Sequence, residues 1–290
     1  YEATEVAKFL LEVEGVDLSS ADLPALYPAL RALFEEHSAL LFRAQSLSDE
    51  KHTEFARLFG PLEDRDIETR KPGEAPKVSE VTNILQDGAV SGEMDLHTLN
   101  LKANFLWHTD STFLPVPALT NTLVARVVTA TGGETELAST RAAWAEMPER
   151  LKDRIRGRGI WHHFSQSRAR ISPELAALPQ FHRWPAQHWK AVWKNPVNGR
   201  EALYIASHAQ LVDGLDETES RALLDELTAF CTRPEFVYAH QWRVGGVLIW
   251  DQRAVLHRGT PWPWSEPRKL SSICTSALDA DGLADMRLAS

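Results

Sequence analysis

FVYAHQW (236–242), GGVLIWD (245–251), AVLHRG (254–259) and KLSSICTSAL (269–278) follow one another near the end of the chain. Each segment is short and rich in β-branched or aromatic residues, and polar, glycine or proline residues separate it from the next, which is typical of antiparallel strands. Two further strand-like runs, TNTLVARVVT (120–129) and ETELAS (134–139), precede them. Strands therefore dominate much of the chain after residue 120.

Helical patterns lie before and between these strands. They cover residues 22–37, a segment from Ser48 to about Leu58, a segment from Thr140 to about Gly157 that Pro148 interrupts, and residues 216–231, which Asp216 caps. Because strand and helix do not alternate, a doubly wound parallel sheet is disfavoured. The order favours a mainly β chain with flanking helices, built around an antiparallel double-sheet barrel.

Three stretches show no clear period. Residues 62–76 are charged, with proline and glycine, and we expect a surface loop there. Residues 86–103 are polar, and because loops of that length in compact domains are often lids, we expect a lid loop. Residues 158–190 are rich in His, Trp, Pro and Arg and are expected to be irregular, with Trp161 and Trp193 indicating an aromatic pocket.

A hairpin is expected in AVWKNPVNGREALYIA (191–206), with Asn198-Gly199 as its turn. Two more strands are expected, at residues 39–43 and 77–84.

The composition of the chain limits the classes of function that it can have. The 290 residues suffice for one large domain, expected over 1–290, and 31 Lys and Arg against 40 Asp and Glu give a net charge of −9. Such a charge disfavours nucleic acid as a partner. Cys231 and Cys274 are too few for a disulfide framework, and no apolar run reaches the length of a membrane span, so a cytoplasmic setting is expected. Because the chain begins at Tyr1, a removed leader stays open.

The segment NFLWHTDSTF (104–113) contains candidate metal ligands. On a strand, His108 and Asp110 would point to the same face. His257, at the end of an apolar strand, is the candidate for a third ligand. A set of two histidines and one carboxylate leaves one face of an octahedral Fe(II) open for a cosubstrate and O2.

An arginine supports this interpretation. Arg268 stands eleven residues after His257, and in an antiparallel hairpin the two could face the same interior. 2-Oxoglutarate chelates iron at one end, and its far carboxylate needs a cation, which a guanidinium supplies in bidentate form.

Other polar residues have simpler explanations. His162 and His163 are adjacent, and neighbours on a strand point to opposite faces, so a structural or substrate-lining role is favoured over a second metal site. His208 and His240 are expected to be core histidines. Asp251 and Arg253 are as consistent with an internal ion pair as with catalysis.

The sequence resembles the taurine/2,4-dichlorophenoxyacetate family of 2-oxoglutarate-dependent dioxygenases over nearly its whole length, most of all the phenoxyalkanoate herbicide dioxygenases. The resemblance rests on SALLFR, FARLFGPLE, WHTDSTF, TGGETEL, RAAW and WDQRAVLHR. It implies a double-stranded β-helix, or cupin-like jelly roll, and a homo-oligomer is a further expectation. The residue roles that it implies are Fe(II) binding by His108, Asp110 and His257, 2-oxoglutarate binding by Thr135, Trp242 and Arg268, and contact with the primary substrate by Asn104 and Ser111.

One position departs from the family pattern. Several members place a second, substrate-binding arginine four residues after the first, where this chain has Ser272. Asp110 is intact, whereas halogenating relatives replace the metal carboxylate, so hydroxylation is favoured over halogenation, while desaturation or ring closure stays open.

The hypothesis is therefore an Fe(II)- and 2-oxoglutarate-dependent dioxygenase that uses O2 to hydroxylate a small organic substrate. An aryloxyalkanoate or another aromatic acid is the expected substrate, with ether cleavage following hydroxylation. The alternatives are a sulfonate (taurine-like) dioxygenase, a non-catalytic jelly-roll binding protein, and a zinc hydrolase that uses the same three ligands.

Overall fold

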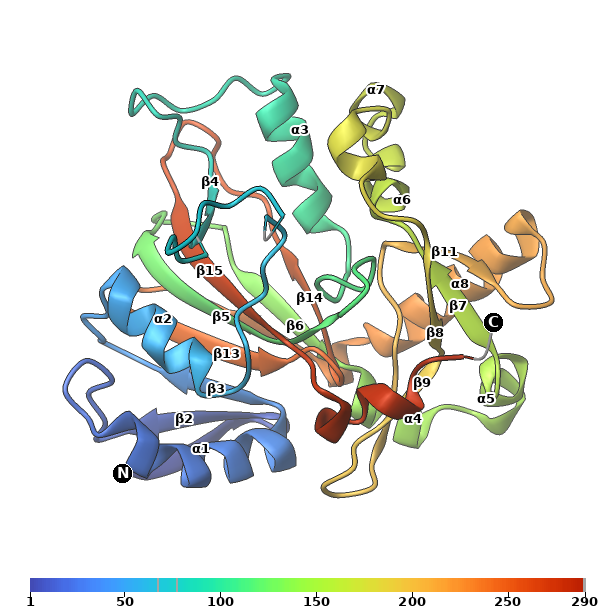
Figure 1. Ribbon diagram of the computed structural model, residues 1–290, viewed down its shortest axis with the longest axis horizontal. Helices are drawn as coiled ribbons and strands as arrows, with labels where there is room; N and C mark the ends of the chain where they lie inside the picture. The colour runs from blue at the N-terminus through green and yellow to red at the C-terminus, as the bar shows by residue number, and fades with distance from the viewer. Residues whose placement is uncertain (67, 77, 289–290) are drawn as a thin grey trace.

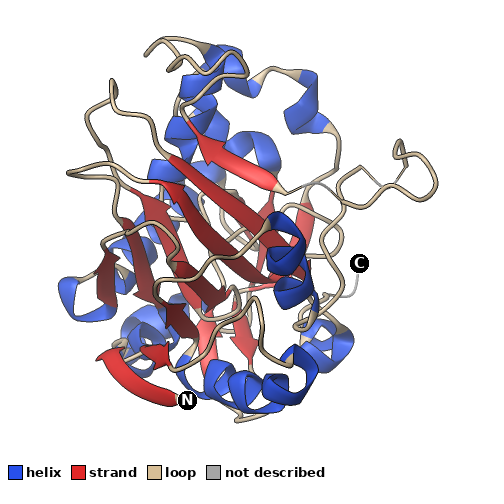
Figure 2. Cartoon of the chain, turned by 90° about the vertical axis from the view of Figure 1, so that its left-hand side faces the viewer, coloured by secondary structure: helices blue, strands red, loops and turns tan. Residues whose placement is uncertain are grey.

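Two sheets form the centre of the structure. The computed structural model describes residues 1–66, 68–76 and 78–288. Strands of the larger sheet run side by side in Figure 2, and the pair β2–β3 is parallel while the other pairs are antiparallel. In spatial order this sheet contains β1 (Glu2–Ala7), β2 (Leu10–Glu14), β3 (Ala39–Phe42), β13 (Val247–Asp251), β5 (Ala118–Val127), β15 (Lys269–Ser276) and β4 (Ser79–Thr82).

A smaller antiparallel sheet faces the larger one. Leu123 and Leu270 of the larger sheet share a buried cluster with Leu137 and Val255 of the smaller sheet. Because side chains alternate along a strand, each sheet has one face toward this core and one toward the helices. Two facing sheets, antiparallel except for the pair β2–β3, with helices outside agree with the predicted mainly β fold. The smaller sheet contains, in order, β12 (Val237–His240), β6 (Thr135–Ser139) and β14 (Val255–Gly259).

The outward face of the larger sheet is covered by α1 (Leu23–His37) and α2 (Asp49–Arg57) (Figure 1). Phe34 and Phe55, one from each helix, lie in a buried cluster with Ile249 of β13. Both helices begin where the sequence predicts, because at each N-cap a side-chain oxygen accepts a backbone N–H of the first turn.

The outward face of the smaller sheet is covered by α4 (Thr140–Glu146) and α8 (Glu217–Cys231). Side chains of both helices share a buried cluster with Leu256 of β14. The predicted interruption at Pro148 separates α4 from α5 (Glu149–Ile155). Within the described ranges, no helix has both the length and the apolar character needed to cross a bilayer.

Two segments predicted to lack regular structure contain short elements. A helix of seven residues, α3 (Leu96–Lys102), ends the stretch 86–103, and such a helix is too short to show a periodic pattern. At one end of the molecule α3 lies near two short helices of the 158–190 segment (Figure 1). The elements of that segment are β7 (Gly159–His162), α6 (Phe164–Ala169), α7 (Pro173–Ala176), η2 (Pro179–His182) and β8 (Gln187–Lys190).

The predicted hairpin in residues 191–206 is confirmed, since β9 (Val192–Lys194) and β10 (Glu201–Leu203) pair antiparallel. Gly199 in the connection has a φ of 73°, which glycine adopts without strain. The remaining elements are η1 (Ala103–Phe105), β11 (Ala209–Val212), η3 (Pro234–Phe236), η4 (Asp279–Asp281) and η5 (Leu283–Asp285).

The hairpin expected to join His257 and Arg268 does not form. β14 lies in the smaller sheet and β15 in the larger one, so residues 260–268 cross between the sheets. Three prolines in this connection remove backbone donors that a ladder would need. His257 and Arg268 nevertheless line the same cavity.

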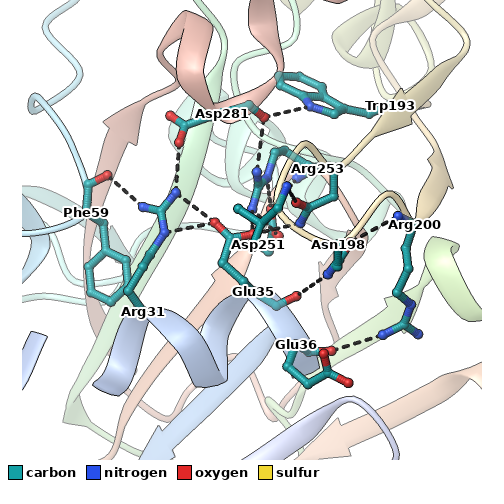
Figure 3. A network of polar contacts seen from close by, with 12 residues as sticks. Arg31, Glu35, Glu36, Phe59, Trp193, Asn198, Arg200, Asp251, Arg253 and Asp281 are labelled. Carbon is teal, nitrogen blue, oxygen red and sulfur yellow. Dashed lines mark hydrogen bonds and ion pairs between the residues drawn. The ribbon is translucent and has the colours of Figure 1, made fainter. Parts of the chain in front are cut away.

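A buried charge network ties the helix α1 to the end of the chain (Figure 3). Arg253 lies 2.8 Å from an oxygen of Asp251 and 2.7 Å from one of Glu35. Arg31 lies 2.8 Å from oxygens of both Glu35 and Asp281. The internal ion pair predicted for Asp251 and Arg253 is therefore confirmed, and it fixes the turn between β13 and β14.

Candidate functional site

A cavity of about 830 Å³ opens between the two sheets. Its wall includes residues of β5 and β15 from the larger sheet and of β6 and β14 from the smaller one. Residues 62–66, 69–70 and 74–76 of the predicted surface loop also line it. Six of the predicted site residues line this cavity: Asn104, His108, Asp110, Thr135, His257 and Arg268.

The three predicted metal ligands meet at one point of this wall. Asp110 Oδ1 lies 3.4 Å from His108 Nε2 and 3.4 Å from His257 Nε2. All three ligand atoms lie within 4.8 Å of one another. Two imidazole nitrogens and one carboxylate oxygen are the donor set of mononuclear Fe(II) oxygenases, so the residues present fit such a metal.

The backbone brings these ligands together without the strand that was expected. His108 forms an isolated bridge with His257, with N···O distances of 3.0 and 2.8 Å. Asp110 lies in a turn, and Ser111 after it has a φ of 65°, in the left-handed region. A non-glycine residue there is uncommon and is found at functional sites, where the surroundings hold it.

Hydrogen bonds leave the metal-facing atoms free. The Nδ1–H of His108 donates to the carbonyl oxygen of Leu106 at 2.7 Å, so Nε2 carries the free lone pair. Asp110 Oδ2 accepts hydrogen bonds from Asn121 Nδ2 at 2.6 Å and from Gln252 Nε2 at 2.7 Å. Its other oxygen, Oδ1, faces the two histidines.

Ionisation favours metal binding too. Burial lowers the pKa of His257, which keeps the imidazole neutral. Burial alone would raise the pKa of Asp110, but the charge and hydrogen bonds that His257 and His108 offer when they are protonated hold it well below its usual range, and a bound cation would take over that task. A neutral imidazole and an anionic carboxylate are the forms that ligate a metal.

Ser272 belongs to the surroundings of the metal carboxylate. Its hydroxyl donates to Asn121 Oδ1 at 2.9 Å, which turns the Asn121 amide N–H toward Asp110. The residue that stands where several family members place an arginine therefore supports a metal ligand in this chain. Cys274, one inward position further along β15, also approaches Asp110, with Sγ 3.7 Å from Oδ2.

Arg268 is a buried cation without an ion-pair partner in the described parts of the chain. Its Nη2 donates to the carbonyl oxygen of Gly133 at 2.8 Å, and its guanidinium carbon lies 4.7 Å from the centre of the Trp262 ring. Burial lowers the pKa of Arg268 to about 10, a cost that a bound carboxylate would relieve. The arginine thus fits the far carboxylate of a dicarboxylic cosubstrate.

Thr135 and Trp242 form a pair beside this arginine. The indole Nε1–H of Trp242 donates to Thr135 Oγ1 at 2.8 Å. Because an indole is only a donor, the threonine hydroxyl keeps its own proton for another acceptor. Thr135 lines the cavity, whereas Trp242 acts on it through the threonine.

Several predicted residues lie away from the cavity wall. Ser111 is fully buried and its hydroxyl accepts a hydrogen bond from Arg65 at 3.2 Å. The expected aromatic pocket from Trp161 and Trp193 is wrong: Trp161 stacks on His188, and the buried Trp193 donates to a backbone oxygen of η4. Phe105 and Trp262 provide the aromatic part of the cavity wall instead.

The adjacent histidines separate as the sequence suggests. His162 is buried in β7, and burial lowers its pKa to about 3. His163 caps α6 by accepting the backbone N–H of Ser165. The two therefore do not form a second metal pair.

Sequence reasoning missed the residues that hold Asp110 and those at the cavity mouth. Asn121 carried a signal, since it shares an inward strand face with Leu123, and a polar residue on such a face is informative. Gln252 stood in the WDQR motif without an assigned role. Arg65 lay in a segment that its charge made look like ordinary surface.

Comparison with known families gives one match over most of the chain. Residues 3–274 match the family model described as "Taurine catabolism dioxygenase TauD, TfdA family".

Curated relatives agree with this match. The chain is 36% identical over 270 residues to the alpha-ketoglutarate-dependent 2,4-dichlorophenoxyacetate dioxygenase of Cupriavidus pinatubonensis, which covers 92% of this chain and 94% of that protein. It is 33% identical to the (S)-phenoxypropionate/alpha-ketoglutarate-dioxygenase of Sphingobium herbicidovorans, over 90% of each chain.

A solved structure shares the fold. The crystal structure of AAD-2 in complex with Mn(II) and N-oxalylglycine superposes with a TM-score of 0.87 and 29% sequence identity, covering 95% of this chain and 96% of that chain. The predicted jelly-roll core is therefore confirmed.

Proposed function

Because the chain belongs to the taurine catabolism dioxygenase TauD, TfdA family, we propose that it is an Fe(II)- and 2-oxoglutarate-dependent dioxygenase that hydroxylates an aryloxyalkanoic acid. One observation carries the proposal: a metal-binding triad and a buried arginine without an ion-pair partner line the same cavity in the described residues. Neither feature alone implies a dicarboxylic cosubstrate. Together they offer a metal that one end of the cosubstrate can chelate and a cation that can bind the carboxylate at the other end.

Each group of the chain has a task in this proposal. His108, Asp110 and His257 hold Fe(II), while Arg268 and the Thr135 hydroxyl bind the far carboxylate of 2-oxoglutarate. When bound, the metal with 2-oxoglutarate and O2 supplies the oxidation that inserts an oxygen atom into a C–H bond and yields succinate and CO2. Hydroxylation next to an ether oxygen gives a hemiacetal, which breaks down to a phenol and a carbonyl compound.

The substrate class rests on the relatives. Those reported above are named for 2,4-dichlorophenoxyacetate and phenoxypropionate, both aryloxyalkanoic acids. Asn104 is the candidate for a direct contact, because it lines the cavity near the metal ligands. Ser111 contributes by holding Arg65 rather than by touching the substrate.

Residues 86–103 act as a lid in this proposal. Leu101 and Asn104, at the end of this segment and just after it, line the cavity. Hydrogen bonds anchor the segment: His97 Nε2 lies 2.8 Å from the carbonyl oxygen of Thr82, Trp264 Nε1–H donates to the carbonyl oxygen of Ser91 at 2.7 Å, and Asn100 accepts from Arg168 at 3.1 Å. Few anchors of this kind allow a segment to open and close.

A reducing compartment such as the cytoplasm suits this chemistry. Cys231 and Cys274 are free thiols, and Cys274 lies beside Asp110. Reducing conditions would keep that thiol and Fe(II) in their reduced forms.

The test is anaerobic addition of Fe(II) and 2-oxoglutarate to the metal-free protein. A weak visible charge-transfer band is expected, and its absence in folded protein would overturn the proposal. With air and 2,4-dichlorophenoxyacetate, succinate should then form. Asp110→Ala should abolish both signals, and Arg268→Ala should raise the 2-oxoglutarate requirement by about 100-fold. A zinc hydrolase with the same ligands would turn over without O2.

A further inference from the structure

Two arginines from different parts of the chain lie against one phenylalanine ring beside the metal ligands. The guanidinium carbons of Arg65 and Arg168 lie 5.5 and 4.7 Å from the centre of the Phe164 ring. Phe164 stacks on Phe113, with ring centres 3.9 Å apart and planes inclined by 6°. The charge of Asp110 acts on both guanidinium groups, so this aromatic pair holds both cations near the candidate metal ligands.

Arg65 is held in a fixed orientation. Its Nε–H donates to Glu63 Oε2 at 3.1 Å and its Nη2–H to Ser111 Oγ at 3.2 Å. Its guanidinium also lies 5.0 Å from the Phe113 ring centre. Nη1 has no hydrogen-bond partner among the described residues, and the side chain lines the cavity. A donor edge therefore remains available to a ligand.

Arg168 lacks an acidic partner in the described parts of the chain. Its Nε–H donates to Asn100 Oδ1 at 3.1 Å and its Nη1–H to Ser167 Oγ at 2.9 Å, and both acceptors are neutral. Burial and then the like charge of Arg65 lower the pKa of Arg168 to about 10. Glu63 pairs with Arg65, and Asp110 acts electrostatically on both arginines, but Asp110 is a candidate metal ligand, so a further anion would stabilise these two neighbouring cations.

The other polar or cationic side chains that could bind an anion at this cavity already have partners or another role. The hydroxyl of Ser272 is used on Asn121, as described above. Arg70 is ion-paired with Asp64. Arg268 lies beside Gly133 and Thr135 and serves the cosubstrate in the proposed function.

We infer that Arg65, which lines the cavity, binds the carboxylate of the primary substrate, and that Arg168, which is not among the cavity-lining residues, supports it with a second positive charge, in place of the arginine that several family members carry at the position of Ser272. This carboxylate subsite rests on the proposed function, because it defines how that cavity holds its substrate. Guanidinium groups bind carboxylates through paired N–H donors, and their stacking on Phe164 and Phe113 preorganises them.

The experiment compares an acid with its uncharged amide. Protein loaded with Mn(II) and N-oxalylglycine is titrated in a calorimeter with 2,4-dichlorophenoxyacetate and with 2,4-dichlorophenoxyacetamide. The parent should bind the acid at least about 10-fold more tightly. Arg65→Met and Arg168→Met should each remove most of this preference. Arg65→Lys should retain part of it, because lysine keeps the positive charge but lacks the paired N–H donors of a guanidinium. Binding of N-oxalylglycine should be unchanged.

Arg70→Met is the matched control, since Arg70 lines the same cavity but is paired with Asp64; it should keep the preference for the acid. A role of Arg168 in merely holding α6 near α3 would weaken acid and amide equally. Should Arg168→Met fail to fold, the two Arg65 variants decide the question. Full acid preference in Arg65→Met, or none in the parent, overturns the subsite and leaves the proposed function intact. Failure of N-oxalylglycine to bind the Mn(II)-loaded parent counts against the proposed function itself.

Discussion

Asp110 depends on neutral neighbours for its orientation. Asn121 and Gln252 both donate hydrogen bonds to Asp110 Oδ2, and the Ser272 hydroxyl fixes the orientation of the Asn121 amide in turn. Such partners of a metal ligand reduce the freedom that metal binding would otherwise have to remove. The metal affinity of the site therefore depends on residues that never touch the metal.

Replacing Asn121 tests this dependence. Asn121→Leu removes the donor while keeping the side chain's size, so the Mn(II) dissociation constant should rise by about 10- to 100-fold. The measurement is calorimetric titration of the metal-free protein. Ser272→Ala should have a smaller effect in the same direction.

Ser271 provides the control for Ser272. It is the adjacent residue on β15, and its hydroxyl accepts a hydrogen bond from Arg126 at 3.3 Å instead. Ser271→Ala should leave the Mn(II) affinity unchanged. Equal effects of the two serine substitutions would refute the role assigned to Ser272.

At the level of residues, the sequence predicted which candidate metal ligands come together, and that Arg268 lines the same cavity, because their chemical types and spacing are restrictive. It could not predict Arg65 as part of the wall, because a charged residue in a charged loop looks the same whether it faces water or a cavity. Ser111 was placed near the substrate by likeness alone; it is buried, and its hydroxyl accepts a hydrogen bond from Arg65, which lines the cavity.

Among the elements, α3 and the residues before it form the lid of the proposed function. The ring of His97 and the carbonyl oxygen of Ser91 anchor it, and Arg168 contacts it at Asn100. Arg168 belongs to α6, so the lid and the substrate subsite share a residue.

Hydrogen exchange should detect closure of this segment. Amide exchange in residues 86–102 should slow several-fold when Mn(II), N-oxalylglycine and 2,4-dichlorophenoxyacetate are all present. Peptides from α8, on the far side of the smaller sheet, should exchange at the same rate with and without ligands. Unchanged exchange in 86–102 would mean that the segment is a fixed wall.

Elements with strong local signals were predictable. α1, α2 and α8 have side-chain caps that begin them where the sequence indicates. The sequence could not predict that β14 and β15 belong to different sheets. The two strands follow one another along the chain, and only the packing of the whole core assigns each to a sheet. The short helices of residues 158–190 are stabilised by tertiary contacts that no local window contains.

Across the whole molecule, the network of Figure 3 links distant parts of the chain. Arg253 is buried, and it neutralises Glu35 and Asp251 at once. Its turn also carries Gln252, which binds Asp110. Stability and the metal site are therefore coupled through this arginine.

Removing that arginine should be costly. Arg253→Met leaves the buried Asp251 without its ion-pair partner and Glu35 with Arg31 alone, so the free energy of unfolding in urea should fall by about 3–5 kcal/mol. Arg154→Met breaks an exposed pair with Glu226 and should cost less than about 1 kcal/mol. Comparable losses in the two variants would contradict the importance of the buried network.

Buried histidines should make the protein sensitive to acid. Burial lowers the pKa of His52 to about 4 and those of His162 and His240 to about 3. In the unfolded chain each histidine takes up a proton near pH 6.5, so between pH 6.5 and about 4 the unfolded state binds more protons. The free energy of unfolding should therefore fall as the pH falls through this window, by about 1.4 kcal/mol per pH unit for each histidine.

Urea unfolding between pH 8 and pH 5 measures this slope. His162→Phe should reduce it by the contribution of one proton, because the variant has no group to titrate at that place. Identical slopes in the parent and the variant would show that His162 is protonated in the folded state.

The stacking of Arg268 on an indole has an optical consequence. Trp262 lies under the guanidinium, its ring centre is 5.1 Å from that of Trp264, and Trp264 in turn donates to Ser91. Indole emission responds to nearby charge and to solvent. Neutralisation of the arginine by a cosubstrate and closure of the segment that contains Ser91 both act on this pair of chromophores. The protein thus contains its own fluorescent reporter of occupancy, and a difference spectrum can follow the filling of the site without any label.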